Sequence, residues 1–210
     1  MGMEGIPEFG RRARIEGNPE LNRLRRAIEA IVVPGAGRSE LEQLLALEPQ
    51  RDEVGNLRYL VTSGMAVELV TGFEREHHDL DLVIMDPANV DYWEIYGTDN
   101  VTPQRYWADM RFDPAFLQDT VRTTQTRRNH GTVAEVVHPA ILMVQKSSNA
   151  FGRPPRGKDN ADVVAIVRHW KDREKYIRTW NPIARAALDA LPPNQIDTTL
   201  KRLRASMGQK

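Results

Sequence analysis

The chain has 210 residues, 40% of them apolar and 28% charged, which is enough for one domain with a buried core, with or without a helical extension. Basic and acidic residues number 29 each, so the zero net charge argues neither for nor against a nucleic-acid partner. The absence of cysteine excludes disulfides and thiolate metal sites. No apolar run approaches a membrane span and the first residues lack the apolar core of a signal peptide, so we expect a cytoplasmic protein with no membrane partner.

The chain begins with a polar, glycine-bearing stretch that contains the basic run Arg11-Arg12-Ala13-Arg14, and we expect it to be mobile. No internal repeat or low-complexity segment follows it. The predicted elements divide the chain into four parts: a mobile arm over 1–17, an N-terminal helical segment over 18–54, a core over 55–137 and a C-terminal helical region over 138–210.

The N-terminal segment has the signals of two helices. Asn18-Pro19 supplies a cap and a first-turn proline, and apolar residues follow at helical spacing up to Ile31. Ser39 and Glu42 then have the spacing of a capping box for a second helix that runs through Leu47. The glycines between the two helices are not followed by a Lys-Ser or Lys-Thr ending, so we interpret them as a helix stop and not as a Walker-type phosphate loop.

The core begins with a strand, a turn, a helix and a second strand. Arg58 to Thr62 predicts the first strand, Ser63-Gly64 a tight turn, and Met65 to Val70 a short helix. Leu80 to Met85 is a short apolar run of strand-forming residues and predicts a buried strand. A helix that starts behind a glycine turn presents free N–H groups and the positive end of its dipole, which suits an anion such as a triphosphate.

Two carboxylates stand at the start of the second strand. Side chains alternate along a strand, so Asp79 and Asp81 point to the same face, with Cα atoms roughly 6.5 Å apart at about 3.3 Å per residue. Like charges this close would raise each other's pKa, and a cation is the simplest way to keep both ionised. Mg²⁺ commonly binds one or two carboxylates together with the phosphates of a substrate. The pair therefore predicts magnesium-dependent phosphate chemistry.

Two other interpretations of this strand start remain open. Asp79 could end the strand while Asp81 pairs with a lysine, which would make both residues structural. His77 and His78 raise the question of zinc, which needs three or four ligands at suitable spacing. With no cysteine and with the other histidines far away in the sequence, we expect the pair to be solvated or to face substrate.

The order strand, Ser-Gly turn, helix and Arg75-Glu76-His77-His78-Asp79-Leu80-Asp81 resembles the nucleotidyltransferase superfamily of the DNA polymerase β type. Within it, the chain is most similar to the lincosamide and aminoglycoside nucleotidyltransferases and to the AbiEii-type toxins. Those families usually have Gly-Gly or Gly-Ser in the turn, whereas Ser63-Gly64 has the reverse order. The resemblance implies one or two Mg²⁺ ions at Asp79 and Asp81, and the phosphates of an NTP such as ATP at Ser63, Gly64 and Arg75.

The remainder of the core is less regular. Asp86 to Gln104 is polar with scattered aromatic residues, and we expect an irregular excursion from the sheet. Val121 to Thr126 and Thr132 to Val137 predict paired strands. The resemblance implies a third carboxylate on a neighbouring strand, which joins the metal pair and can act as a base. Glu135 is our candidate, with Asp119 as the second choice, and a structural surface glutamate is the alternative.

The C-terminal region contains a second informative block. His138-Pro139 begins a helix with core-like apolar residues, and we expect Lys146 toward its exposed end. A basic loop rich in glycine and proline follows, and Asp159 to Asp162 then begin another apolar helix. A helix with a lysine, an arginine-containing loop, Lys-Asp-x-x-Asp and an apolar helix, in this order, are similar to the C-terminal half of the AbiEii-type nucleotidyltransferases.

Physical roles for this block follow as hypotheses. Lys146 would neutralise charge on the β- or γ-phosphate as pyrophosphate leaves. Asp162, and as a second choice Asp159, would orient that lysine or Lys158, or position the acceptor. The guanidinium groups of Arg153 and Arg156 in the loop could also bind a phosphate in bidentate fashion. For each residue the alternative is a solvated charge at a helix end.

The end of the chain is helical and increasingly basic. Asn181-Pro182 is predicted to begin one helix and Pro192-Pro193 to stop it. A final helix then carries Leu200, Leu203 and Met207 on its apolar side. Its basic residues suit RNA phosphates, and a solvated face explains them equally well.

These observations predict an α/β (α+β) fold with a small mixed β-sheet nucleotidyltransferase core, N-terminal helices and a C-terminal helical bundle. We expect a magnesium-dependent transferase that moves an NMP from an NTP to an acceptor hydroxyl. The first choice is the toxin of a toxin-antitoxin pair, with an antitoxin as partner and tRNA or protein as acceptor. An antibiotic-modifying enzyme is the second choice, and a non-catalytic nucleotide- or RNA-binding module on the same scaffold is the third.

Overall fold

The structure is a computed structural model of the chain. It describes residues 19–31, 37–73, 79–85, 101–104, 116–117, 119–120, 126–127, 133–149, 154–171 and 174–208. The arm expected over 1–17 lies outside these residues, as do Arg75, His77, His78 and Arg153. Within the described parts of the chain, no helix is long and apolar enough to cross a bilayer.

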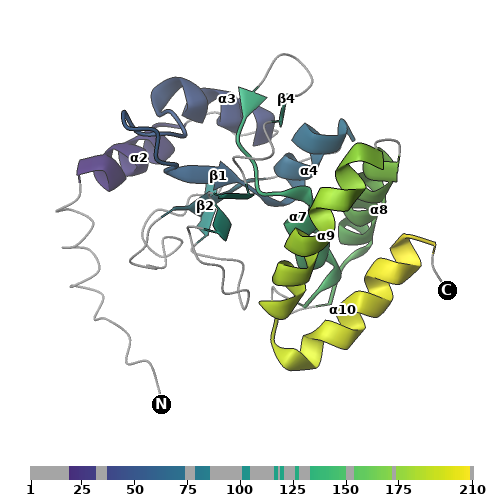
Figure 1. Ribbon diagram of the computed structural model, residues 1–210. Coiled ribbons are helices and arrows are strands. Elements are labelled where there is room, and N and C mark those ends of the chain that lie inside the picture. The colour runs from purple at the N-terminus through teal and green to yellow at the C-terminus, as the bar shows by residue number, and fades with distance from the viewer. Residues whose placement is uncertain are drawn as a thin grey trace.

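The described residues form an α+β fold in which helices lie on both sides of a small sheet (Figure 1). N-terminal helices and C-terminal helices are both present, as expected from the sequence, and they occupy opposite sides of the molecule. The elements, in chain order, are α2 (Pro19–Ala30), α3 (Gly37–Leu47), β1 (Tyr59–Val61), α4 (Ser63–Thr71), β2 (Leu80–Ile84), β3 (Val101–Gln104), β4 (Thr126–Arg127), β5 (Val133–Ala134), α7 (Pro139–Ser147), α8 (Gly157–Lys171), α9 (Glu174–Asp189) and α10 (Pro193–Ser206).

The three-stranded sheet has the order β1-β2-β3. β1 runs antiparallel to β2, and β2 runs parallel to β3, with Asp81 opposite Thr102. The expectation of an irregular stretch over 86–104 is therefore wrong at its end, where the chain returns as a strand. β3 has no alternating apolar pattern and contains Pro103, which an edge strand tolerates because its outer N–H positions need no partner. These two features hide the strand in the sequence.

β1 has partners on both edges, which explains why so short a strand is fully buried. On the edge away from β2, Val61 N–H donates to Glu135 O at 3.1 Å, and Val137 N–H donates to Val61 O at 2.9 Å. All residues of β1 and the apolar residues of β2 contribute to one hydrophobic core. The position at which β1 ends and α4 begins is thereby fixed from both sides.

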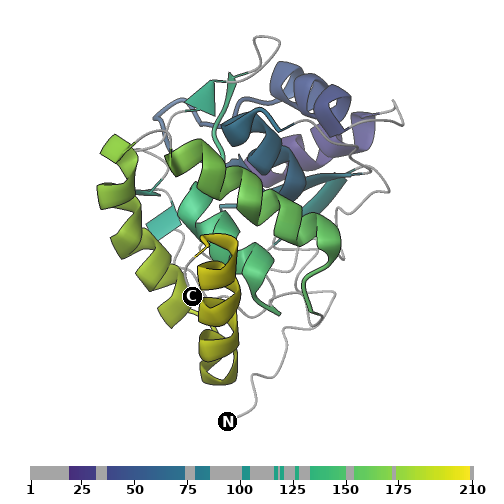
Figure 2. The same cartoon turned by 90° about the vertical axis from the view of Figure 1, so that its right-hand side faces the viewer.

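The C-terminal helices form a bundle around α7, every residue of which is buried. α4, α8, α9 and α10 all pack against α7, and Figure 2 shows α10, in yellow, beside α9 at the lower end of the bundle. The expectation that Lys146 lies toward an exposed helix end is wrong, because these neighbours cover the last turn of α7 and leave Lys146 3% exposed. The helix expected to begin at Pro182 begins earlier, since α9 continues through that proline while packed along α7.

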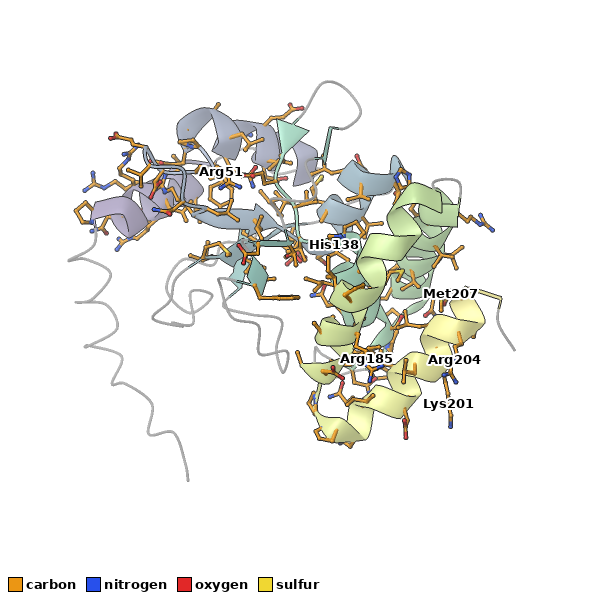
Figure 3. The ribbon with its side chains drawn as sticks, viewed as in Figure 1. Arg51, His138, Arg185, Lys201, Arg204 and Met207 are labelled. Atoms are coloured by element: carbon orange, nitrogen blue, oxygen red, sulfur yellow. The ribbon has the colours of Figure 1, made fainter. Side chains whose placement is uncertain are left out.

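α7 begins at a buried histidine cap. His138 Nδ1 accepts a hydrogen bond from Ala140 N–H at 3.1 Å, and Pro139 occupies the first turn, as the sequence predicted. Figure 3 places His138 between the sheet and the bundle, and the residue is 3% exposed. Burial lowers the pKa of His138 to about 4, so the ring is neutral at neutral pH.

This cap makes stability depend on pH. Between the unfolded pKa of 6.5 and the folded pKa of about 4, only the unfolded state binds the proton, so stability falls as the pH falls through this window. We expect His138 to account for up to about 3 kcal/mol of that loss. Urea denaturation of the wild type and of His138→Asn, which keeps a cap acceptor without titrating, measures it at pH 7, 5.5 and 4.5. Equal losses in both proteins would contradict the prediction.

Candidate functional site

The candidate site is built around the first turn of α4. Thr62 N–H donates to Asp81 O at 3.0 Å, so the end of β1 is tied to the strand that carries the acidic pair. Ser63 follows with φ at +55°, a left-handed conformation that is uncommon for a residue with a side chain. Ser63 and Gly64, which the sequence suggested as a separate turn, already belong to α4. Unusual backbone of this kind often accompanies functional sites.

A buried ion cluster joins this turn to α7 and α8. The ammonium of Lys146 donates to Ser63 Oγ at 3.2 Å and to Asp159 Oδ1 at 3.3 Å, and it lies 3.1 Å from Asp162 Oδ2. Side-chain exposure is 2% for Lys146, 3% for Asp159 and 0% for Asp162. The structure therefore brings together the Ser-Gly stretch and the Lys-Asp-x-x-Asp block. We call Ser63, Lys146, Asp159 and Asp162 the Lys146 cluster.

Local structure explains why Asp159 lies in the cluster. It is the third residue of α8, and its Oδ2 accepts hydrogen bonds from the backbone N–H of Arg156 at 2.8 Å and from Arg156 Nε at 3.2 Å. The backbone contact is one half of a capping box. Asp162 follows close to one turn later, so both carboxylates lie on the face of α8 that meets Lys146. The half-exposed guanidinium of Arg156 adds a positive charge at the rim of a cluster that holds two carboxylates and one ammonium.

The acidic pair lies at the start of β2, next to this turn. Asp79 is exposed just before the strand, and Asp81 is half-buried within it. The two carboxylates are separated by one residue, and carboxylate oxygens are ligands that Mg²⁺ prefers. No group of three or more acidic or histidine side chains that could hold a metal occurs among the described residues, and the neighbouring His77 and His78 lie outside them.

Glu135, the candidate third carboxylate, is bound to Arg51 and not to the acidic pair. Its carboxylate binds the guanidinium of Arg51, with Nε to Oε1 at 3.0 Å. Gln50 completes the contact: its Nε2 donates to Glu135 O at 2.7 Å, and its Oε1 accepts from Glu135 N–H at 2.6 Å. We call this contact of Gln50 and Arg51 with Glu135 the 50–135 clamp. β1 lies between the clamp and β2, so the structure does not bring Glu135 beside Asp79 and Asp81.

The remaining predicted residues have varied positions. Gly64 is buried in α4, Lys158 is exposed in the first turn of α8, and Asp119 is exposed. Sequence reasoning missed Thr62, whose hydroxyl is buried beside Ser63 and has no hydrogen-bond partner among the described residues. It also missed Arg202 as a contact of α7. A threonine before a Ser-Gly pair was the available signal for the first, and no local pattern indicates the second.

Comparison with known proteins gives no match to this chain. No protein-family model matches the chain, and neither a curated protein nor a solved structure matches it. The candidate function therefore depends on the residues and contacts described above.

The Lys146 cluster predicts a large stability effect. Lys146→Met would leave two buried carboxylates without their ammonium, and we expect a loss of about 3–5 kcal/mol in the free energy of unfolding. Adding Asp159→Asn and Asp162→Asn removes the unpaired charges, so the triple variant should recover more than half of that loss. Urea denaturation measures both variants. A triple variant less stable than the single one would contradict this account of the cluster.

The positive φ of Ser63 predicts which of its variants is the more stable. Ser63→Gly and Ser63→Ala both lose the hydroxyl that accepts from Lys146, but only glycine adopts this backbone conformation without strain. We expect the glycine variant to be more stable than the alanine variant by about 1 kcal/mol. The two midpoints of urea denaturation test this order directly, and an alanine variant as stable as the glycine variant would refute it.

Proposed function

We propose that this chain is a magnesium-dependent nucleotidyltransferase, which moves an NMP from an NTP to an acceptor hydroxyl. The observation that supports the proposal best is the contact between Lys146 and Ser63, which are 83 residues apart in the sequence. It gathers the Lys-Asp-x-x-Asp block at the first turn of α4, and Thr62 connects that turn to the backbone of Asp81. Three motifs that the sequence suggested separately thus adjoin one another.

Ser63 is the group that we propose meets the phosphates. Its oxygen accepts a hydrogen bond from Lys146, so its own hydroxyl hydrogen can be donated to a phosphate oxygen. The first turn of α4 adds N–H groups that have no partner within the helix and the positive end of the helix dipole. A triphosphate at this turn would therefore meet aligned donors of one polarity.

The role that we propose for Lys146 differs from the direct phosphate contact that the sequence suggested. Its ammonium is buried against three protein side chains, Ser63, Asp159 and Asp162. We propose that it orients the Ser63 hydroxyl and contributes positive charge from beneath the site. Such preorganised charge stabilises the negative charge that builds up as pyrophosphate leaves. Lys158 and Arg156 are the more exposed cations near the start of α8 and remain candidates for direct contact.

Asp79 and Asp81 would hold one or two Mg²⁺ ions. When bound, Mg²⁺ screens the triphosphate and makes an acceptor hydroxyl easier to deprotonate. The two carboxylates set the position at which the acceptor oxygen approaches the α-phosphorus. The new bond forms there, the bond to the bridging oxygen of the pyrophosphate breaks, and the hydroxyl proton passes to solvent.

The acceptor follows from the resemblance and not from the geometry. We propose a cytoplasmic toxin that modifies tRNA or protein and is held in check by an antitoxin, and as an alternative an enzyme that modifies aminoglycosides or lincosamides. A non-catalytic nucleotide- or RNA-binding module is a second candidate function. It is favoured by the position of Glu135, because the carboxylate expected to complete the acidic site is engaged in the 50–135 clamp.

Transfer of label tests the proposal. The protein is incubated with Mg²⁺ and each α-labelled NTP, in the presence of total tRNA, of the protein itself, or of a panel of aminoglycosides and lincosamides. We expect label on one acceptor and a loss of at least about a hundredfold in Asp79→Asn and Asp81→Asn, because each removes a charge that holds the metal. Asp197→Asn, at an exposed carboxylate of α10, is the matched control and should keep full activity.

The outcomes separate the candidates. Retained turnover in Asp81→Asn would overturn the site assignment. Saturable NTP binding without label on any acceptor would favour the binding module. Toxicity on expression that a partner gene relieves would identify a toxin, whereas antibiotic resistance of the host would identify a drug-modifying enzyme.

A further inference from the structure

α10 contacts the carboxyl end of α7 through an arginine. Arg202 Nη1 donates to Ser147 O at 3.1 Å and to Asn149 Oδ1 at 3.0 Å. The backbone N–H of Asn149 donates in turn to Gln195 Oε1 of α10 at 3.1 Å. Ser147 directly follows Lys146, so these contacts meet α7 in the turn that carries the buried ammonium. Figure 2 shows α10 in front of α7 at this end of the bundle.

Arginine suits this position for a physical reason. The last carbonyls of a helix have no partner within it, and the dipole makes that end negative. A guanidinium there satisfies a carbonyl and interacts favourably with the dipole. Figure 3 shows the difference from the other cations of α10, since Lys201 and Arg204 lie on its outer side and are exposed. Arg202 points into the bundle instead.

Apolar and polar contacts both dock α10: Leu203 belongs to the core, and Ile196 and Met207 pack against it. Within this helix, all of which is described, Thr199 and Leu203 are the buried residues. The hydroxyl of Thr199 has no hydrogen-bond partner among the described residues, and neither does the buried amide of Gln145 on α7. Buried polar groups without partners oppose the docking of the helices that carry them. Apolar packing has no fixed direction, so the hydrogen bonds of Arg202 and Gln195 are the contacts that set where α10 meets the end of α7.

The Lys146 cluster is sensitive to the position of this turn. Its ammonium must reach Ser63 on α4 and two carboxylates on α8 at once, over distances of 3.1 to 3.3 Å. These are near the upper limit for such contacts, so a small shift of the last turn of α7 breaks them. α10 packs against α8 as well as α7 and thus braces both helices that supply the cluster.

We infer that α10 is a positioning element for the site and that Arg202 acts through Lys146: by fixing the last turn of α7, it keeps the ammonium in contact with Ser63. Arg202 itself contacts neither the acidic pair nor Ser63 in the described structure. The inference rests on the proposed function for the meaning of the Lys146–Ser63 contact. The position of the ammonium can be measured without any turnover.

Hydrogen exchange of the lysine ammonium tests this inference. The ¹⁵Nζ signal of Lys146 is observed by NMR in the full chain and is assigned by its disappearance in Lys146→Arg. In Arg202→Met we expect its exchange to accelerate about tenfold or more, as for the loss of a charge-assisted hydrogen bond. Arg202→Lys keeps the charge and should show a smaller increase. Arg204→Met, at an exposed cation two residues away on the same helix, is the matched control and should leave the exchange unchanged.

A comparison within the same sample separates positioning from general stability. Backbone amides of Val61 and Met85, hydrogen-bonded in and beside the sheet, report opening of the sheet. Faster exchange of the Lys146 ammonium with unchanged exchange at these amides supports the inference. Equal acceleration at all three would show that Arg202 merely stabilises the fold, and unchanged ammonium exchange would show that α7 holds Lys146 without it. Either result overturns the inference, and neither depends on whether the protein transfers nucleotides.

Discussion

The buried ammonium of Lys146 is the constraint to which the other features of the site adjust. A charge taken out of water is costly unless partners surround it, so Lys146 can be buried only where α4 and α8 deliver oxygen atoms to it. The left-handed backbone of Ser63, the cap at the start of α8 and the burial of the last turn of α7 all serve that contact. The Lys146 cluster therefore joins the candidate site on α4 to the helices α7 and α8 of the C-terminal bundle.

Local signals in the sequence were sufficient for much of the fold. The apolar run of β2 and the His-Pro start of α7 have patterns within a few residues, and both elements begin where the pattern predicts. The acidic start predicted for the next helix lies in the first turn of α8, which begins earlier, at Gly157. The presence of Lys146, Asp159 and Asp162 in one block was also visible. Their mutual contact follows from helix spacing once α7 and α8 are packed together, and that packing has no local signature.

Other features could not be predicted because they depend on distant neighbours. A lysine in the last turn of a helix normally reaches solvent, and only the covering helices bury Lys146. Glu135 looks like a free strand carboxylate until Arg51, 84 residues away, is found beside it. β3 has a proline and no alternation, so its pairing with β2 is decided by the sheet and not by its own residues.

The 50–135 clamp has a consequence for how the chain folds. The amide of Gln50 takes the place of a strand neighbour, since it both donates to and accepts from the backbone of Glu135, and the two residues are 85 positions apart. β1 and β2 can pair early because they are close in the sequence. On the other edge of β1, Gln50 reaches Tyr59 O, but Val61 gains its strand neighbour when residues 135–137 arrive. An unpaired strand edge is a template for association with other chains. A nascent or truncated chain that ends before residue 133 would thus carry a sheet open to aggregation, and closing that edge is what the late-arriving segment accomplishes.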